Sequence, residues 1–417
     1  MRLTLRQIRK IIIGLCFLLL AGGGGYWLGQ REISIAVRRP LPQIRIERKI
    51  PASKQEVSLD LFWQVWDRLE DSYLERKEID YQKMVYGAIS GMVSSLGDPY
   101  TVFLPPTENK EAKEDLRGDF EGVGIQIGYD KEKRLAIIAP LTGTPAEGAA
   151  LKAGDLILRI VDEKKKLDRE TIGISLPQAV KDIRGPRGSV VKLTIARNGI
   201  EEPFEVALKR ETIVVKSVEA KFEEKDGQKV AILRLSRFGE RTYQEWQEAV
   251  EEIKQAAKVK NFAGVILDLR NNPGGFLQGA VFVGSEFLSS GVIVQQDQGA
   301  DGKETYSVNR QGELLREPLV VLINGGSASA SEIVAGALQE RKRAKLVGET
   351  SFGKGTIQEA EDLAGGAGLH ITVARWLLPS GKSVDKEGVI PDLVVKMDEN
   401  NETKDPQLEK AIALLTG

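Results

Sequence analysis

The chain has 417 residues, which at about 150 residues a domain corresponds to about three domains. Hydrophobic residues make up 41% and charged residues 29%, a composition typical of globular proteins rather than of disordered chains. Because 59 basic residues nearly balance 60 acidic ones, bulk charge predicts no nucleic-acid binding. A single cysteine, Cys16, argues against a disulfide framework, and a single histidine, His370, argues against a histidine-based zinc site. We expect no metal and no cofactor.

The first thirty residues have the pattern of an export segment. Four basic residues lie among the first ten, and the stretch from Ile11 to Gln30 carries no charge. Twenty residues in a helix span a bilayer core of about 30 Å, so residues 1–30 are predicted to be a membrane anchor. A cleaved signal peptide is the alternative, because small residues follow the apolar core and consecutive glycines weaken a helix.

Both interpretations place the rest of the chain outside the cytoplasm, since the basic side of the segment stays cytoplasmic. We therefore expect a cell-envelope protein. It is either anchored in the inner or plasma membrane and faces the periplasm or extracytoplasmic side, or it is released there after signal cleavage.

The region that follows is predicted to contain a linker and then helices. Residues 31–54 hold three prolines among scattered charges, which is typical of a linker. Residues 55–115 form an N-terminal helical region, where apolar residues recur with helical spacing from Ser58 to Tyr73 and from Tyr81 to Leu96. These two helices are expected either to pack in a core or to dimerise.

The remaining chain divides into a β-rich module and an α/β region. Residues 116–210 contain short strands broken by glycine and proline turns. In residues 211–417 strands alternate with helices, and the continuous apolar runs 265–269 and 319–323 are typical of strands buried on both faces. Helices are expected at 146–151, 176–183, 242–257, 330–341 and 405–415.

One segment of the α/β region, Val320–Leu338, joins a buried strand to a helix through a glycine turn that carries several serines. A serine at such a turn lies beside free backbone N–H groups and the positive end of a helix dipole, which can stabilise an oxyanion. A helix-capping role is the alternative, because Ser329 and Glu332 form an S-x-x-E capping box. The pattern alone leaves open which of Ser327, Ser329 and Ser331 would be a nucleophile.

A second segment places Lys354 between two glycines, where the backbone can shape a pocket. A lysine acts as a base near neutral pH only when burial lowers its pKa from about 10.4. The segment also approaches a P-loop, since Gly348 and Gly353 precede Lys354 at the required spacing. Gly355 stands where a P-loop needs Ser or Thr to hold magnesium, so no nucleotide site is expected.

A third segment, Leu267–Gly275, is a strand that ends in a polar glycine turn. It is either an ordinary strand-to-helix loop or the source of a second oxyanion N–H group. His370 lies in an alternating strand pattern without a supporting motif, so we expect it not to be catalytic. If Ser329 is a nucleophile, Lys354 is the better base.

The chain resembles the carboxyl-terminal processing proteases, also called tail-specific proteases, over about residues 57–417. Five motifs occur in the family's order: S-L-G-D-P-Y-T (95–101), R-N-N-P-G-G (270–275), S-A-S-A-S-E-I (327–333), F-G-K-G-x-x-Q (352–358) and P-S-G-x-S (379–383). The resemblance implies a serine–lysine dyad with Ser329 as nucleophile and Lys354 as base, oriented by Gln358. It also implies an oxyanion hole from the backbone N–H groups of Ala330 and of Gly274 or Gly275.

The module at 116–210 resembles a PDZ domain, a class that binds C-terminal tails by strand addition and captures the carboxylate with backbone amides. The resemblance implies a carboxylate loop at Gly122, Val123, Gly124 and Ile125, within F-E-G-V-G-I. It also implies that the helix at 176–183 lines the peptide groove.

Together these resemblances imply a crotonase-like α/β protease core with an inserted β-rich PDZ domain and an N-terminal helical region. The implied function is an exported serine endopeptidase that recognises proteins or peptides with free C-terminal tails and cleaves them through an acyl-enzyme. The implied partners are these substrates, a membrane through the N-terminal segment, and further copies of the chain. The alternatives are a PDZ-type binding scaffold on a catalytically silent protease shell, and a serine–lysine amidase for small amides.

Overall fold

The computed structural model describes residues 31–36, 43–48, 58–397 and 404–417. The chain forms two compact units, Met1–Met84 and Val85–Gly417. The anchor or signal peptide predicted at residues 1–30 lies outside the described residues. Within the described ranges, no helix is long and apolar enough to cross a membrane.

Residues 31–54 were predicted to be a linker but contain two paired strands. Strands β1 (Arg31–Ala36) and β2 (Gln43–Arg48) are antiparallel, with Arg31 opposite Arg48 and Ala36 opposite Gln43. Isoleucine occupies alternate positions in both strands, a spacing that favours β structure. The prolines that suggested a linker, Pro40, Pro42 and Pro51, come between or after the two strands in the sequence, so none interrupts either strand.

The two predicted N-terminal helices are present as α2 (Asp60–Ser72) and α3 (Tyr81–Ser94). Helix α2 has no buried side chain, so the prediction that it packs in a core is wrong for the described chain. Its aromatic residues contact one another instead, and Trp66 stacks on Tyr81 with ring centroids 6.0 Å apart. Dimerisation through this exposed face stays a prediction.

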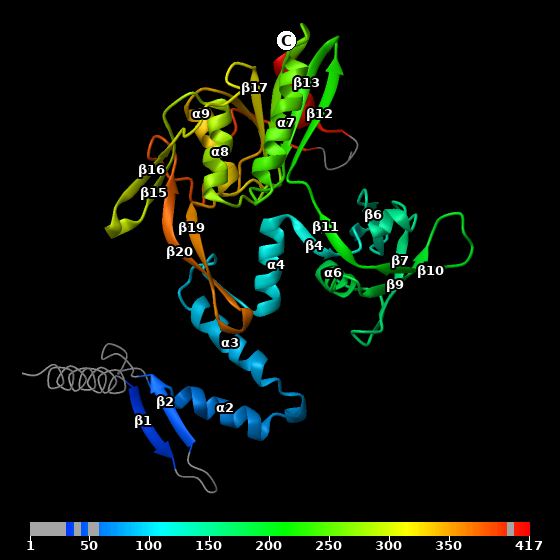
Figure 1. The fold of residues 1–417 in the computed structure, drawn as a ribbon, viewed down its shortest axis with the longest axis vertical. Coiled ribbons are helices and arrows are strands. Elements are labelled where there is room, and N and C mark those ends of the chain that lie inside the picture. Colours follow the sequence, from blue (N-terminus) through cyan, green and yellow to red (C-terminus); the bar gives the residue numbers. More distant parts are fainter. Residues whose placement is uncertain (1–30, 37–42, 49–57, 398–403) are drawn as a thin grey trace, which may run out of the picture. The chain divides into compact units, whose positions relative to one another are not determined.

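The second unit is built on a six-stranded sheet with the order β12-β13-β14-β17-β18-β21. Strand β12 is antiparallel to β13, and the other neighbours are parallel. The strands are β12 (Val218–Lys225), β13 (Gln228–Leu235), β14 (Phe262–Asp268), β17 (Leu319–Ile323), β18 (Lys345–Gly348) and β21 (Leu393–Val394). The α/β architecture predicted for this region is confirmed (Figure 1).

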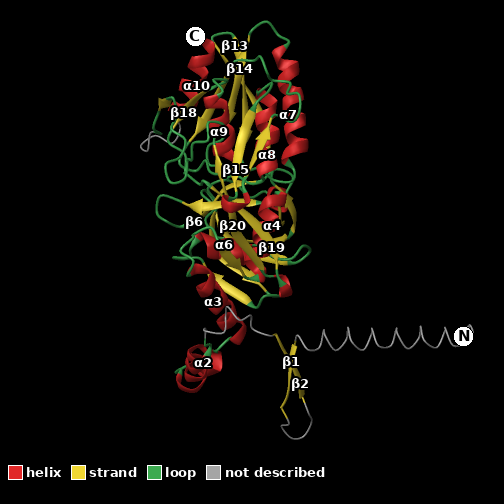
Figure 2. Cartoon of the chain, turned by 90° about the vertical axis from the view of Figure 1, so that its left-hand side faces the viewer, coloured by secondary structure: helices red, strands yellow, loops and turns green. Residues whose placement is uncertain are grey.

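Helices cover both faces of this sheet, as the continuous apolar strands predicted. One face packs against α7 (Thr242–Ala257), α8 (Leu277–Phe287) and α9 (Ala330–Glu340), and the other against α10 (Pro406–Thr416). Consecutive residues of β14 divide between the two cores, with Val265 on the first and Ile266 on the second. Figure 2 shows α7 and α10 on opposite sides of β13 and β14.

A smaller antiparallel sheet, with the order β16-β15-β20-β19, adjoins the core. Its strands are β15 (Val292–Asp297), β16 (Lys303–Ser307), β19 (Thr356–Asp362) and β20 (Gly368–Leu377). The short strand β3 (Val102–Leu104) pairs with β20, which places Val102 opposite His370. Helix α4 (Pro106–Arg117) follows β3 and leads to the β-rich module.

The β-rich module has its own sheet, with the order β10-β9-β7-β6-β5, and its own buried core. The elements are β5 (Ile125–Tyr129), β6 (Leu135–Pro140), α5 (Pro145–Gly148), β7 (Leu156–Asp162), β8 (Leu167–Glu170), α6 (Leu176–Ile183), β9 (Val190–Ala196) and β10 (Phe204–Lys209). The chain enters the module through β4 (Asp119–Gly122) and leaves it through β11 (Glu211–Val214), and these two strands pair with each other.

Candidate active site

Two turns lie at the carboxyl ends of the neighbouring parallel strands β14 and β17, the edge of an α/β sheet where sites usually form. We call residues 269–276 the β14 turn and residues 324–329 the β17 turn. Asn271 and Asn324 join them: the Asn271 N–H donates to Asn324 Oδ1, and Asn324 Nδ2 donates to Asn271 Oδ1, each at 2.9 Å. These hydrogen bonds therefore fix the positions of the two turns relative to each other.

Two of the three candidate serines also form hydrogen bonds to the β14 turn. Ser327 Oγ donates to the Leu269 carbonyl at 2.8 Å, and Ser331 Oγ donates to the Asn272 carbonyl at 2.9 Å. Both side chains are fully buried. Ser329 is half-buried, so it alone of the three serines has partial access to solvent.

Ser329 has an unusual backbone conformation, with φ 53° and ψ −116° at the N-cap of α9. The positive-φ region is sterically strained for any residue that has a Cβ, and such strained residues are concentrated at functional sites. The neighbouring Ala330 N–H has no acceptor among the described residues. Ser329 thus lies beside a free backbone donor at the start of a helix.

The two glycines proposed for the second donor differ in their hydrogen bonds. The Gly274 N–H donates to Asn272 Oδ1 at 2.9 Å, whereas the Gly275 N–H has no acceptor in the described part of the chain. Glycine is needed at Gly274, where φ is 98° and a Cβ would lie 2.8 Å from the Cβ of Ser329. The β14 turn therefore packs directly against Ser329.

Glu332 connects the nucleophile segment to the lysine segment. Its carboxylate is fully buried and accepts hydrogen bonds on both oxygens. Oε2 accepts the backbone N–H of Ser329 at 2.7 Å and of Lys354 at 2.9 Å. Oε1 accepts the Gly353 N–H at 2.7 Å and Ser351 Oγ at 2.6 Å. The predicted capping interaction is therefore present at Ser329, and the same carboxylate also binds the lysine segment.

Lys354 is half-buried, and burial lowers the pKa of its amine below the ordinary value, although the charges of Asp98 and Glu332 act in the opposite direction. Its Nζ lies over the ring of Tyr100, 5.0 Å from the centroid. Its carbonyl accepts the indole N–H of Trp376 at 2.7 Å. Burial therefore shifts this amine toward the neutral form that a general base requires.

The expected contacts of the Lys354 side chain are not formed in this structure. Gln358 Nε2 donates instead to Thr356 Oγ1 at 2.8 Å and to Thr372 Oγ1 at 3.1 Å. Among the described residues, no hydrogen bond joins Lys354 to Gln358 or to Ser329. The site brings these groups to one edge of the sheet without aligning them.

The 98–101 segment also contributes to the site, which the sequence patterns treated only as a turn and a family motif. Asp98 accepts Thr101 Oγ1 at 2.6 Å and the Tyr100 N–H at 3.0 Å. Thr101 Oγ1 accepts the Thr372 N–H at 3.0 Å, which ties the segment to β20. This arrangement places Tyr100 against Lys354, a long-range contact that no local pattern reports.

His370 is half-buried on β20 and is closer to the site than its sequence context suggested. Burial lowers its pKa, and the positive charge of Lys354 lowers it further. No hydrogen bond within the described ranges joins His370 to Ser329.

The four predicted carboxylate-loop residues line a groove of about 150 Å³ in the β-rich module. The groove also includes Phe120, Ile127, Val180, Ile183 and Arg184. Helix α6 therefore forms one wall, as predicted. Gly124 has φ 77°, and a Cβ there would collide with the side chain of Thr144, so the loop requires glycine at this position.

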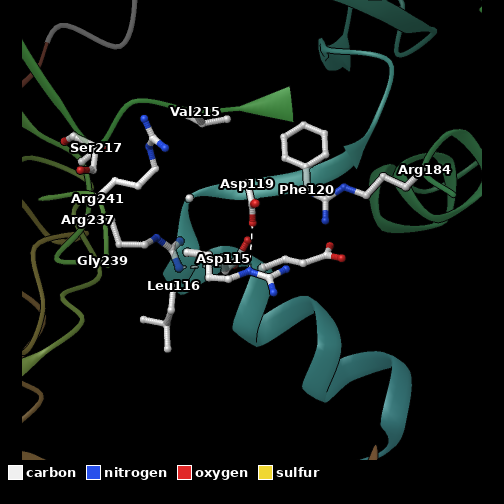
Figure 3. Close-up of a pocket in the computed structure, with 14 residues that line it drawn as sticks. Asp115, Leu116, Asp119, Phe120, Arg184, Val215, Ser217, Arg237, Gly239 and Arg241 are labelled. Atoms are coloured by element: carbon white, nitrogen blue, oxygen red, sulfur yellow. Dashed lines mark hydrogen bonds and ion pairs between the residues drawn. The ribbon is translucent and has the colours of Figure 1, made fainter. Parts of the chain in front are cut away.

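A second pocket of about 240 Å³ lies where the paired strands β4 and β11 meet the α/β core (Figure 3). Its charged side chains are largely paired, including Arg117 with Asp119 and Arg237 with Asp115. Arg184 lines this pocket and the groove, and its guanidinium lies 4.2 Å from the centroid of the Phe120 ring.

Three family models match the chain: Peptidase family S41 over residues 229–395, PDZ domain over 111–196, and Activating protease CtpB N-terminal domain over 19–107. A carboxyl-terminal-processing protease of Synechocystis is 38% identical over 361 residues, which cover 85% of this chain and 82% of that protein. The carboxy-terminal processing protease CtpA of Bacillus subtilis is 33% identical over 346 residues, covering 83% and 71%.

A solved structure of a putative S41 protease from Bacteroides fragilis has the same fold. It superposes with a TM-score of 0.55 at 16% identity and covers 85% of this chain and 97% of that one.

We predict that Glu332→Gln lowers the free energy of unfolding by about 2–3 kcal/mol, because hydrogen bonds to a charged acceptor are lost and an amide N–H₂ faces backbone donors. Labelling of Ser329 by a fluorophosphonate should also slow. Urea unfolding and labelling rates measure the two effects. Glu340→Gln is the matched control, since Glu340 lies on the same helix but binds Ser380 away from the site. Equal effects of the two substitutions would contradict the role given to Glu332.

Proposed function

Because the chain belongs to the carboxyl-terminal processing proteases of peptidase family S41, which are serine-type peptidases, we propose that it is an exported endopeptidase that cleaves polypeptides by a serine–lysine dyad. The observation that carries this proposal is the arrangement around Glu332. One carboxylate binds the backbone of both Ser329 and Lys354, and the N–H groups of Ala330 and Gly275 have no acceptor among the described residues.

In the proposed reaction Ser329 Oγ attacks the scissile carbonyl while its proton passes to the neutral amine of Lys354. The N–H groups of Ala330 and Gly275 stabilise the oxyanion. We favour Gly275 over Gly274 because the Gly274 N–H already binds Asn272. The lysine then protonates the leaving amine as the scissile C–N bond breaks. Water attacks the acyl-enzyme and gives a proton to Lys354, the ester bond to Ser329 Oγ breaks, and Lys354 returns the proton to Ser329 Oγ.

This reaction requires Lys354 Nζ to leave the Tyr100 ring and approach Ser329 Oγ. Gln358 would orient the lysine once its amide turns away from Thr356 and Thr372. Both movements are side-chain rotations, because the backbone of Lys354 is already held by Glu332 and Trp376.

We further propose that the PDZ groove binds a free C-terminal tail beside β5. Strand addition would supply backbone hydrogen bonds, and the N–H groups of residues 122–125 would bind the carboxylate. The apolar side chains of Ile127, Val180 and Ile183 fit a tail that ends in an apolar residue. This groove favours polypeptide substrates over the small amides of the amidase alternative.

Export is proposed from residues 1–30 alone, as a membrane anchor or a cleaved signal peptide. The main rival function is a PDZ-type scaffold on a silent protease shell. Ser329, Lys354 and Gln358 are all present, and burial favours the neutral form of Lys354, which supports the enzyme over the scaffold. Cleavage of a tailed peptide by the wild type but not by Ser329→Ala separates the two.

We predict that Ser329→Ala lowers kcat by a thousandfold or more, as loss of a nucleophile does. Ser327→Ala and Ser331→Ala should each destabilise the turns by about 1 kcal/mol but keep measurable cleavage. Peptide cleavage and thermal melting should be measured together. A folded Ser329→Ala protein that still cleaves would overturn the dyad.

We predict that kcat/KM rises with pH as Lys354 loses its proton, and that the rise ends below pH 10.5 because burial lowers this pKa. Lys354→Arg should be inactive, since a guanidinium does not deprotonate. His370→Ala should keep kcat within about twofold and keep the rise with pH. If the rise disappears in His370→Ala and Lys354→Arg remains active, histidine is the base.

We predict that Val180→Asp raises KM for tailed peptides about tenfold and leaves kcat unchanged, because the new charge repels the terminal carboxylate. Val180→Thr is the control, because threonine has nearly the same shape as valine and introduces no charge. Amidation of the peptide should raise KM for the wild type and remove most of the difference between the variants. Equal KM values for free-acid and amidated peptides would argue against carboxylate recognition.

A further inference from the structure

Arg270, at the start of the β14 turn, connects this turn to the C-terminal helix. Its Nε and Nη2 donate to the two carboxylate oxygens of Asp268 at 2.9 and 2.8 Å. Its Nη1 donates to Asp405 Oδ1 at 2.8 Å and to Gln407 Oε1 at 3.2 Å. The Arg270 side chain is 14% exposed, so these interactions are shielded from solvent.

The partners of Arg270 are themselves fixed at the start of α10. Asp405 is the N-cap of this helix and accepts the Leu408 N–H at 2.9 Å. Gln407 is fully buried, and its Nε2 donates to the Val395 carbonyl at 2.8 Å. Farther along, Ile412 packs with Ile266 and Leu322 on the face of the sheet opposite α9.

The residues on either side of Arg270 both bind the β17 turn. The Leu269 carbonyl accepts Ser327 Oγ, and the Asn271 N–H donates to Asn324. Asn271 also has a positive φ of 57°, and the Asn272 N–H donates to the Leu269 carbonyl at 3.3 Å, so the chain reverses direction in a turn centred on Arg270 and Asn271. A guanidinium fixed by two carboxylates and an amide therefore sets where this reversal begins.

We propose that α10 is a positioning element of the active site, which acts through Asp405 and Gln407 on Arg270 and so holds the Gly275 N–H in place for the oxyanion. The proposal rests on the serine–lysine function given above. It makes Asp405 and Arg270 positioning residues, because neither touches the reacting atoms. Helix α10 then stabilises the transition state from the far side of the sheet.

The first test compares kcat and KM in the full chain. Asp405→Ala should lower kcat tenfold or more at unchanged KM, because the oxyanion donor is misplaced only in the transition state. Asp405→Asn keeps an N-cap and an acceptor, so its kcat should lie between those of Asp405→Ala and the wild type. Ile412→Ala is the control, because it weakens α10 packing without touching Arg270 and should keep kcat within twofold.

A double-mutant cycle with Arg270→Met tests whether Asp405 acts through Arg270. When Arg270→Met is already present, adding Asp405→Ala should lower kcat by less than a further twofold relative to Arg270→Met alone. The proposal would be rejected if Asp405→Ala had the same kcat as the wild type. It would also be rejected if the losses of kcat caused by the two substitutions were additive. If the Ser329→Ala variant cleaved peptides at the wild-type rate, the serine–lysine function itself would be rejected instead.

Hydrogen–deuterium exchange provides a readout that does not depend on activity. Asp405→Ala should speed exchange in peptides covering residues 269–276 at least tenfold, and Ile412→Ala should not. Equal acceleration in both variants would show that α10 acts only as a structural support, which rejects the proposal.

Discussion

The buried carboxylate of Glu332 is the interaction on which the candidate active site depends. A charge removed from water is costly unless it is fully hydrogen-bonded, and here three backbone N–H groups and one hydroxyl surround it. Two of the N–H groups belong to Ser329 and Lys354, which lie 25 positions apart in the chain (354 − 329). Separating the two segments would leave the carboxylate buried without its donors, so their backbones are held together even though their side chains are not aligned.

A rigid backbone with adjustable side chains also describes the rest of the site. The paired asparagines and the two buried serines fix the turns after β14 and β17. Lys354 and Gln358, by contrast, interact through side chains that have other partners in this structure, namely Tyr100 and two threonines. The backbone of the site is therefore fixed by hydrogen bonds, whereas the side chains of Lys354 and Gln358 make contacts outside the two turns.

Much of the fold could be predicted because its elements have strong local patterns. Helix α7 has the predicted bounds, Thr242–Ala257, and β17 coincides with the apolar run 319–323. Elements without periodicity were missed. Helix α4 is almost entirely polar, and α8 is mostly apolar and buried along nearly its whole length, so neither has the clear amphipathic spacing that identifies a helix. The paired strands β1 and β2 were missed because the prolines between and after them in the sequence suggested a linker.

The candidate site could be predicted only in part. The motifs identified Ser329, Lys354 and the glycines, but residue patterns alone could not choose among three serines. That choice depends on hydrogen bonds to Leu269 and Asn272, which are about 60 positions away in the chain. The contact of Tyr100 with Lys354, and the bond that occupies the Gly274 N–H, likewise arise from tertiary packing.

The connection between the PDZ domain and the core has a mechanical consequence. Both crossings of the chain run through β4 and β11, which are hydrogen-bonded to each other over four residue pairs from Glu211–Gly122 to Val214–Asp119. Two bonded strands act as a single stalk, and the Val215 N–H closes its base on the Gly118 carbonyl at 2.9 Å. A small backbone rotation at Gly118 or Val215 therefore moves the whole domain. The displacement of the peptide groove grows in proportion to its distance from these two residues.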